Sequence, residues 1–260
     1  MVGAAPGRAV GRVHARALVA GALVAVALTS SGCSSPDDAS PAPRAVTAEE
    51  AQLLAIARFK NFDAGARAVS VDFEDAGHAL SLVGWFDYAT GIGYGELADS
   101  GTPNSLLTWQ GDTLAVHPAV GATAPLPPPG AADALDSSWR SGPMDPTSST
   151  LHAVLEFVEE LGSTRPENPL LLQQGGALWL RDDSLAGTPV TVFAGPTGLA
   201  GPSDSPTAPS GDGASRVHYW VDTTGLLLRV DVLLGAAWVT IDLGPGGGVT
   251  LGWSVPGTTA

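Results

Sequence analysis

The stretch HYWVDTTGLLLRV, residues 218–230, contains two short apolar runs on either side of a turn signal. Asp222 and Gly225 begin and end the tetrapeptide DTTG, and a type I turn favours these residue types at its first and fourth positions. Tyr219, Trp220 and Val221 before the turn are residues that strands favour. Because two strands joined by so short a turn pair antiparallel, the stretch predicts a β-hairpin with strands over residues 216–221 and 226–233.

Similar strand patterns continue on both sides of this hairpin. In the first of them Val69, Val71 and Phe73 alternate with polar residues, as expected of a strand with one buried face. Turn residues separate the runs at short intervals, which favours an antiparallel meander. Further strands are predicted over residues 68–74, 78–88, 92–97, 106–116, 177–181, 188–194, 237–243 and 249–255.

Two helices are predicted among these strands. Thr47 and Glu50 have the spacing of a capping box, which indicates a helix over residues 48–61. A second helix is predicted over residues 145–161, with Asp145 as its N-cap. Its apolar side chains follow a helical spacing and form one stripe: Leu151, Val154, Leu155, Val158 and Leu161. The sum is an α+β domain, an antiparallel sheet with helices on one face.

The N-terminus has the pattern of a bacterial lipoprotein signal. Three arginines precede an uncharged apolar run over residues 17–29, which has the length of a signal-peptide core and is too short to span a bilayer as a helix. Ser30, Ser31 and Gly32 then precede Cys33, and small residues before a cysteine resemble a lipobox. We expect a signal peptide over residues 1–32, lipidation of Cys33, a flexible tether over 33–46 and a folded domain over 47–260.

The alternative is an ordinary secretory signal followed by an incidental cysteine. Cys33 is the only cysteine of the chain, and an unmodified free thiol is a liability in an exported protein. A single cysteine also excludes a disulfide framework and a cysteine-rich zinc site. The lipoprotein interpretation places the protein on the extracytoplasmic face of the cell membrane, held there by the lipid.

Charge excludes some partners. The chain has 12 basic and 26 acidic residues, and removal of the first 32 residues, which hold three arginines and no acid, leaves a net charge of −17. Such a surface repels nucleic acids and anionic headgroups, so the membrane partner must be reached through the lipid on Cys33. One lysine against eleven arginines, with abundant Ala, Gly and Pro, is typical of GC-rich genomes such as those of actinobacteria.

The hairpin and the order of elements resemble a known family. Residues 220–229 match the pattern W-V-D-x-x-G-L-x-x-R of LolA-like proteins, in particular the LppX/LprG-type actinobacterial lipoproteins, and residues 184–193 resemble the strand those proteins place before it. The resemblance implies a curved half-barrel of antiparallel strands, with helices packed on its concave face around an apolar cavity for an acyl chain or lipidated partner. The long Pro- and Gly-rich segments 118–144 and 195–215 depart from the family pattern.

Candidate cavity residues come from the second helix and from the strand over 78–88. They are Leu80, Leu82, Phe86, Leu151, Val154, Leu155 and Val158. The alternative for each of them is ordinary core packing. The same two interpretations apply to the seven tryptophans, which either line a lipid pocket or pack in the core.

The sequence lacks the common motifs of catalytic and metal sites. The sequence contains no G-x-S-x-G elbow, no H-E-x-x-H pair and no D-x-D-x-D-G calcium loop, and its acidic pairs fit solvated positions. We therefore expect no catalytic residues, no metal and no cofactor. Two functions remain: a lipoprotein that binds or transfers a lipid or glycolipid, and an envelope sensor that binds a protein partner.

Overall fold

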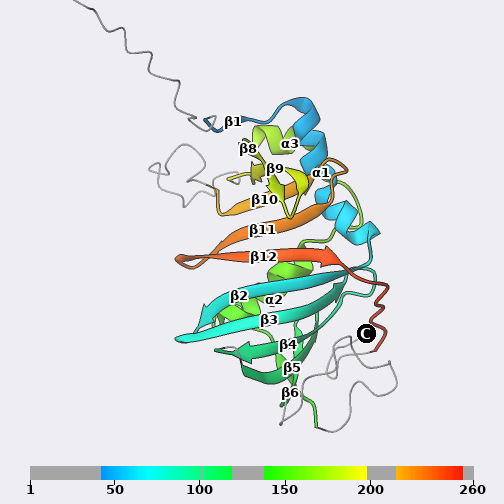
Figure 1. Ribbon diagram of the computed structural model, residues 1–260, viewed down its shortest axis with the longest axis vertical. Coiled ribbons are helices and arrows are strands. Elements are labelled where there is room, and N and C mark those ends of the chain that lie inside the picture. The colour runs from blue at the N-terminus through cyan, green and yellow to red at the C-terminus, as the bar shows by residue number, and fades with distance from the viewer. Residues whose placement is uncertain (1–41, 101, 119–137, 198–214, 254–260) are drawn as a thin grey trace, which may run out of the picture. The chain divides into compact units, whose positions relative to one another are not determined.

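A computed structural model describes residues 42–100, 102–118, 138–197 and 215–253 (Figure 1). All of these belong to one compact unit of the chain. Cys33 and most of the expected tether lie outside the described residues, as do most of segments 118–144 and 195–215.

Twelve strands form one antiparallel sheet in the described part of the chain. Their order is β1-β8-β9-β10-β11-β12-β2-β3-β4-β5-β6-β7, and the sheet is curved and open, with β1 and β7 at its edges (Figure 1). The large antiparallel sheet is therefore confirmed. The strands are β1 (Arg44–Ala45), β2 (Ala66–Asp75), β3 (His78–Asp87), β4 (Ile92–Asp99), β5 (Thr102–Gln110), β6 (Thr113–Pro118), β7 (Arg140–Pro143), β8 (Leu178–Leu185), β9 (Thr188–Ala194), β10 (Val217–Asp222), β11 (Leu227–Leu234) and β12 (Ala237–Pro245).

The described residues form three helices: α1 (Ala48–Asp63), α2 (Thr150–Glu160) and α3 (Pro169–Gln174). The capping box of α1 is confirmed, since Glu50 N–H donates to Thr47 Oγ1 and Thr47 N–H donates to Glu50 Oε2. The predicted N-cap of α2 was wrong. Ser149 caps the helix, whereas Asp145 accepts hydrogen bonds from Thr147 in the turn before it.

Some elements differ from the sequence prediction. Helix α3 is too short to show a helical period, and it relies on its Asn168 cap and its first-turn proline. Strand β1 falls at the end of the expected tether, where Arg44 pairs with Trp179 of β8. The predicted strand over 249–255 is not formed in its described part. There Leu251 N–H donates to Asp87 Oδ2 and Trp253 Nε1 to Thr108 Oγ1, in place of a strand ladder.

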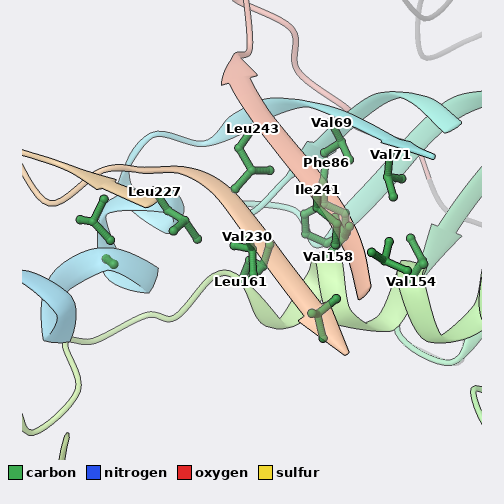
Figure 2. Packing of buried hydrophobic residues seen from close by; sticks show 14 of the residues in the cluster. Val69, Val71, Phe86, Val154, Val158, Leu161, Leu227, Val230, Ile241 and Leu243 are labelled. Atoms are coloured by element: carbon green, nitrogen blue, oxygen red, sulfur yellow. The ribbon is translucent and has the colours of Figure 1, made fainter. Parts of the chain in front are cut away.

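The main core lies between the helices and one face of the sheet. The alternating residues Val69, Val71 and Phe73 of β2 point into it, as the sequence pattern predicts. Val154 and Val158 of α2 pack against these strands (Figure 2). Two smaller apolar clusters lie on the opposite face of the sheet, one over β4 and β5 and one over β8 to β10.

A buried arginine joins the helices to the sheet. Arg67 of β2 is 2% exposed, and its guanidinium donates to Gly244 O, Asn61 Oδ1, Leu227 O and Leu243 O at 2.6–3.0 Å. Asn61 of α1 in turn donates to Leu161 O at the end of α2. Burial lowers the pKa of Arg67, and these neutral acceptors replace the water that it has lost. One side chain therefore connects α1, α2, β11, β12 and β2.

We expect Arg67→Met to lower the free energy of unfolding by about 3 kcal/mol or more, because it leaves several buried acceptors unpaired. Urea denaturation followed by circular dichroism measures the loss. The matched control is Arg216→Met, since Arg216 is exposed and donates to one carbonyl, that of Leu233. An equal loss in both variants would show that the Arg67 network adds nothing beyond a surface hydrogen bond.

Candidate functional site

The sheet is split at one end between β12 and β2. The ladder between these strands runs from Pro245 opposite Arg67 to Ile241 opposite Val71, and no pairing continues beyond that rung in the described residues. Both strands nevertheless continue in their own hairpins, β2 with β3 as far as Asp75 and β12 with β11 as far as Ala237. The two hairpins therefore diverge and leave a wedge-shaped gap between β12 and β2. Each hairpin has an unpaired strand edge at this gap.

A groove of about 740 Å³ occupies this wedge. We call it the β12–β2 groove. Its walls come from the diverging hairpins and from the turn between β4 and β5. The lining residues are Asp72, Phe73, Glu74, Ala79, Leu80, Ser81, Ser100, Ala237, Trp238 and Val239.

The β12–β2 groove is acidic at its rim and apolar at its floor. Trp238 at the rim is 46% exposed, and the carboxylates of Asp72 and Glu74 are on the same outer face of the sheet. Phe73 and Val239 form the floor and are members of the buried main core. The groove thus has an acidic rim with one indole, and its apolar floor continues into the core between sheet and helices.

Helix α2 is fastened to the strand that forms one wall of the groove. The Asp75 carboxylate accepts from Ser149 Oγ at 2.8 Å and from the backbone N–H groups of Thr150 and Leu151 at 3.1 and 3.3 Å. Burial alone would raise the pKa of Asp75, but these hydrogen bonds outweigh it and hold the pKa below its usual range. The end of β2 and the start of α2 are therefore one hydrogen-bonded unit.

Because the folded-state pKa of Asp75 is lowered, its contribution to stability is present above the usual aspartate pKa and is lost as pH falls through the lowered value. We expect Asp75→Asn to lower the free energy of unfolding by about 1–2 kcal/mol at pH 7 and by much less at acidic pH. Urea denaturation of both proteins over a pH series measures this. The control is Asp72→Asn, an exposed change on the same strand. A deficit of Asp75→Asn that does not vary with pH would contradict this role.

The structure brings the seven predicted cavity residues into one apolar cluster. Leu82, Phe86, Val154, Leu155 and Val158 are at most 1% exposed, and Leu80 and Leu151 are partly buried at the edge of the cluster. Of the seven, Leu80 lines the β12–β2 groove, and the others lie behind its floor or farther along the core. Their role as the lining of an acyl site stays a prediction.

Most of the tryptophans pack in the apolar clusters, and one lines the groove. Trp109, Trp179, Trp220 and Trp253 are buried, and Trp85 and Trp139 pack against the second cluster. Trp238 is the most exposed, stacks on His218 with ring centroids 4.7 Å apart, and lines the groove. Sequence patterns could not single it out, because the divergence of β12 from β2 depends on partners distant in the chain.

The described residues offer no constellation for a metal ion. No group of three His, Cys, Asp or Glu side chains in the described ranges could hold a metal ion. Three polar side chains near the groove take part in hydrogen bonds at the start of α2. Ser149 Oγ donates to the Asp75 carboxylate, and His152 Nδ1 accepts from the backbone N–H of Asp145. Within the described part of the chain, no helix has the length and apolarity needed to cross a bilayer.

The fold and groove define an α+β domain built on one open antiparallel sheet, with an apolar groove where two hairpins separate. No protein-family model matches the chain, and neither does any curated protein. Two solved structures are similar to it at 13% identity and a TM-score of 0.39. The lipoprotein LppX of Mycobacterium tuberculosis is matched over 74% of this chain and 94% of its own, and LprF of Mycobacterium bovis over 80% and 98%. At this identity and TM-score, neither structure decides the fold or function of the present chain.

Proposed function

We propose that this protein is a membrane-anchored lipoprotein of the cell envelope that binds a lipid or an acylated molecule through the β12–β2 groove. The observation that carries the proposal is the groove itself. An opening of about 740 Å³ within the sheet has a floor made of core residues, Phe73 and Val239. In this interpretation the protein carries or presents its ligand and catalyses no reaction.

The groove has the properties that an acyl chain requires. Its volume falls in the range of about 300–1,000 Å³ that small-molecule sites occupy. Each methylene moved from water to an apolar surface contributes about 0.8 kcal/mol, so a chain of about ten methylenes binds with little polar recognition. Leu80 and the Trp238 indole would contact such a chain where it enters between the hairpins.

The rim limits the kind of headgroup. Asp72 and Glu74 line the groove, and the described lining includes no cation. A phosphate at this rim would be repelled, whereas sugar hydroxyls can donate hydrogen bonds to carboxylates. We therefore propose an uncharged or glycosylated headgroup outside the groove, with the acyl chain inside.

The predicted cavity residues then acquire a role as the continuation of the groove. Val154, Leu155 and Val158 of α2 lie across the core from Leu82 and Phe86. Deeper entry of a chain requires α2 to move away from the sheet. Asp75 holds the start of α2 to β2, and Asn61 and Tyr88 donate to Leu161 O and Val158 O near its end, so we propose that this movement breaks the hydrogen bonds at one end of the helix.

The unpaired strand edges support a second candidate function. An extended peptide can add to such an edge through main-chain hydrogen bonds. Residues 72–75 of β2 and 237–240 of β12 have no strand partner on the side that faces the gap. A sensor that binds a segment of an envelope protein would use the wedge in this way. The occupant that co-purifies with the protein separates the two functions.

Native mass spectrometry of the chain from Ser34 onward, exported and gently purified, tests the carrier function. We expect a stoichiometric adduct whose extract is a lipid. Trp238→Ala should weaken uptake of an added glycolipid about tenfold, because it removes an indole from the groove wall. Val83→Ala is the matched control, since Val83 is 45% exposed on β3 outside the groove lining. A clean apo mass with no uptake of glycolipid or phospholipid would exclude the carrier function.

The anchor is tested separately. Cys33→Ala should move the full-length protein from the membrane fraction to the soluble fraction, because the acidic domain has no electrostatic attraction to anionic lipid. Mass spectrometry of the N-terminal peptide of the parent protein should show diacylglycerol on the Cys33 sulfur. Unchanged membrane association of Cys33→Ala would show that the protein is not held by this lipid.

A further inference from the structure

Two adjacent leucines protrude from helix α3. Leu170 and Leu171 are each 62% exposed, while their neighbour Leu172 is buried at 5%. Large apolar side chains side by side at this exposure are unusual on a solvated surface, and contiguous apolar patches mark sites of association. Elsewhere among the described residues, the other exposed large apolar side chains are Val83 of β3 and Trp238 of β12, which are not adjacent in the sequence and lie on strands separated by β2.

Two hollows lie beside the leucine pair. One hollow of about 450 Å³, where α1 faces α3, has an apolar wall of Leu53, Ile56 and Pro169 and is also lined by Glu49 and Glu167. A second hollow of about 500 Å³ is lined by Leu171 and Pro196 and also by Arg165 and Glu167. We call Leu170, Leu171 and these two hollows the α3 face.

The segment that contains α3 has no charged residue over a long stretch of sequence. Residues 168–180 read NPLLLQQGGALWL and contain no Asp, Glu, Lys or Arg. Charged side chains resume on either side, at Glu167 and Arg181. The charged residues that line the two hollows lie outside this stretch, so the leucine pair itself can enter the headgroup region of a bilayer while they stay in water.

The α3 face lies beside the point where the N-terminal segment joins the domain. Gln173 Nε2 of α3 donates to Val46 O at 3.3 Å, and Val46 N–H donates to Ala177 O at 3.4 Å, just after β1 pairs with β8 (Figure 1). Cys33 precedes Arg44 by eleven residues, which span at most about 40 Å when fully extended. A lipid on Cys33 would therefore keep the start of β1, and the α3 face beside it, within at most about 40 Å of the membrane surface.

We propose that the α3 face is a membrane-contact surface, and that Leu170 and Leu171 insert among the headgroups of the leaflet that holds the Cys33 lipid. This inference rests on the lipoprotein part of the proposed function and not on the groove. The bilayer is the occupant that fits, because the tether holds the face close to it. Since the domain is acidic, the contact is apolar and is strongest on an uncharged bilayer surface.

Such an orientation separates the anchor from the groove. β12 is the fifth strand from β1 in the sheet order, which corresponds to about 24 Å at the usual strand spacing. The β12–β2 groove would then stay clear of the bilayer, open to a ligand delivered from elsewhere in the envelope.

The test supplies the anchor chemically. In the chain from Cys33 onward, the Cys33 thiol is coupled to a maleimide phospholipid in phosphatidylcholine vesicles, and amide hydrogen exchange is measured by mass spectrometry with and without coupling. We expect exchange over residues 168–176 to slow by roughly tenfold on vesicles, as expected when two leucines leave water, while exchange over β3 stays unchanged. Because the coupled phospholipid takes the place of native acylation, the result can be interpreted whether or not Cys33 is acylated in the cell. It is also independent of whether the groove binds lipid.

Matched variants identify the leucines as the cause. Leu170→Ser with Leu171→Ser should abolish the slower exchange and leave the thermal midpoint unchanged, since both side chains are exposed. The control variant Val83→Ser should keep the slower exchange of residues 168–176 on vesicles. Equal exchange in coupled and uncoupled protein would overturn the proposal. Slow exchange in uncoupled protein at high concentration would overturn it too, because a second copy would then be covering the face.

Discussion

The Arg67 guanidinium is the interaction on which the rest of the structure depends. Its donors reach Gly244, Leu243 and Leu227 in the strands and Asn61 in α1, and Asn61 reaches the end of α2. A buried cation among neutral acceptors is tolerated when its N–H groups are satisfied, so the surrounding carbonyls must keep fixed positions. That requirement holds β12 against β2 at the Arg67 end of their ladder. The same two strands separate beyond Ile241 and Val71.

The wedge follows from this arrangement. β12 and β2 are distant in sequence, and each has a hairpin partner that holds it to its full length. The ladder between them is short, and the Asp75 carboxylate at the end of β2 accepts hydrogen bonds from the start of α2. The result is a groove whose floor is the hydrophobic core. The α3 face, with its exposed leucines, lies beside β1 at the edge of the sheet, so the two surfaces that we assign to binding are separate.

Local patterns predicted the local structure well. The capping box of α1, the alternation of β2, the Asp222 turn of the β10–β11 hairpin and the stripe of α2 all follow from residues close in the chain, whose preferences need no distant partner. Predictions failed where a long-range hydrogen bond prevailed. Ser149 replaced Asp145 as the cap of α2 because Asp75 is its partner, and residues 249–253 took Asp87 and Thr108 as partners in place of a strand.

By itself, the sequence determined an antiparallel α+β domain, an acidic surface, the signal-like N-terminus with its single cysteine, and the apolar residues that share one core. Periodicity and composition suffice for these, since each depends on side-chain type and spacing alone. The tertiary structure decided which strands separate, that Trp238 lines the groove while most other tryptophans are buried, and that Leu170 and Leu171 stay exposed while Leu172 packs. Those outcomes depend on contacts between segments far apart in the chain, and no local pattern encodes them.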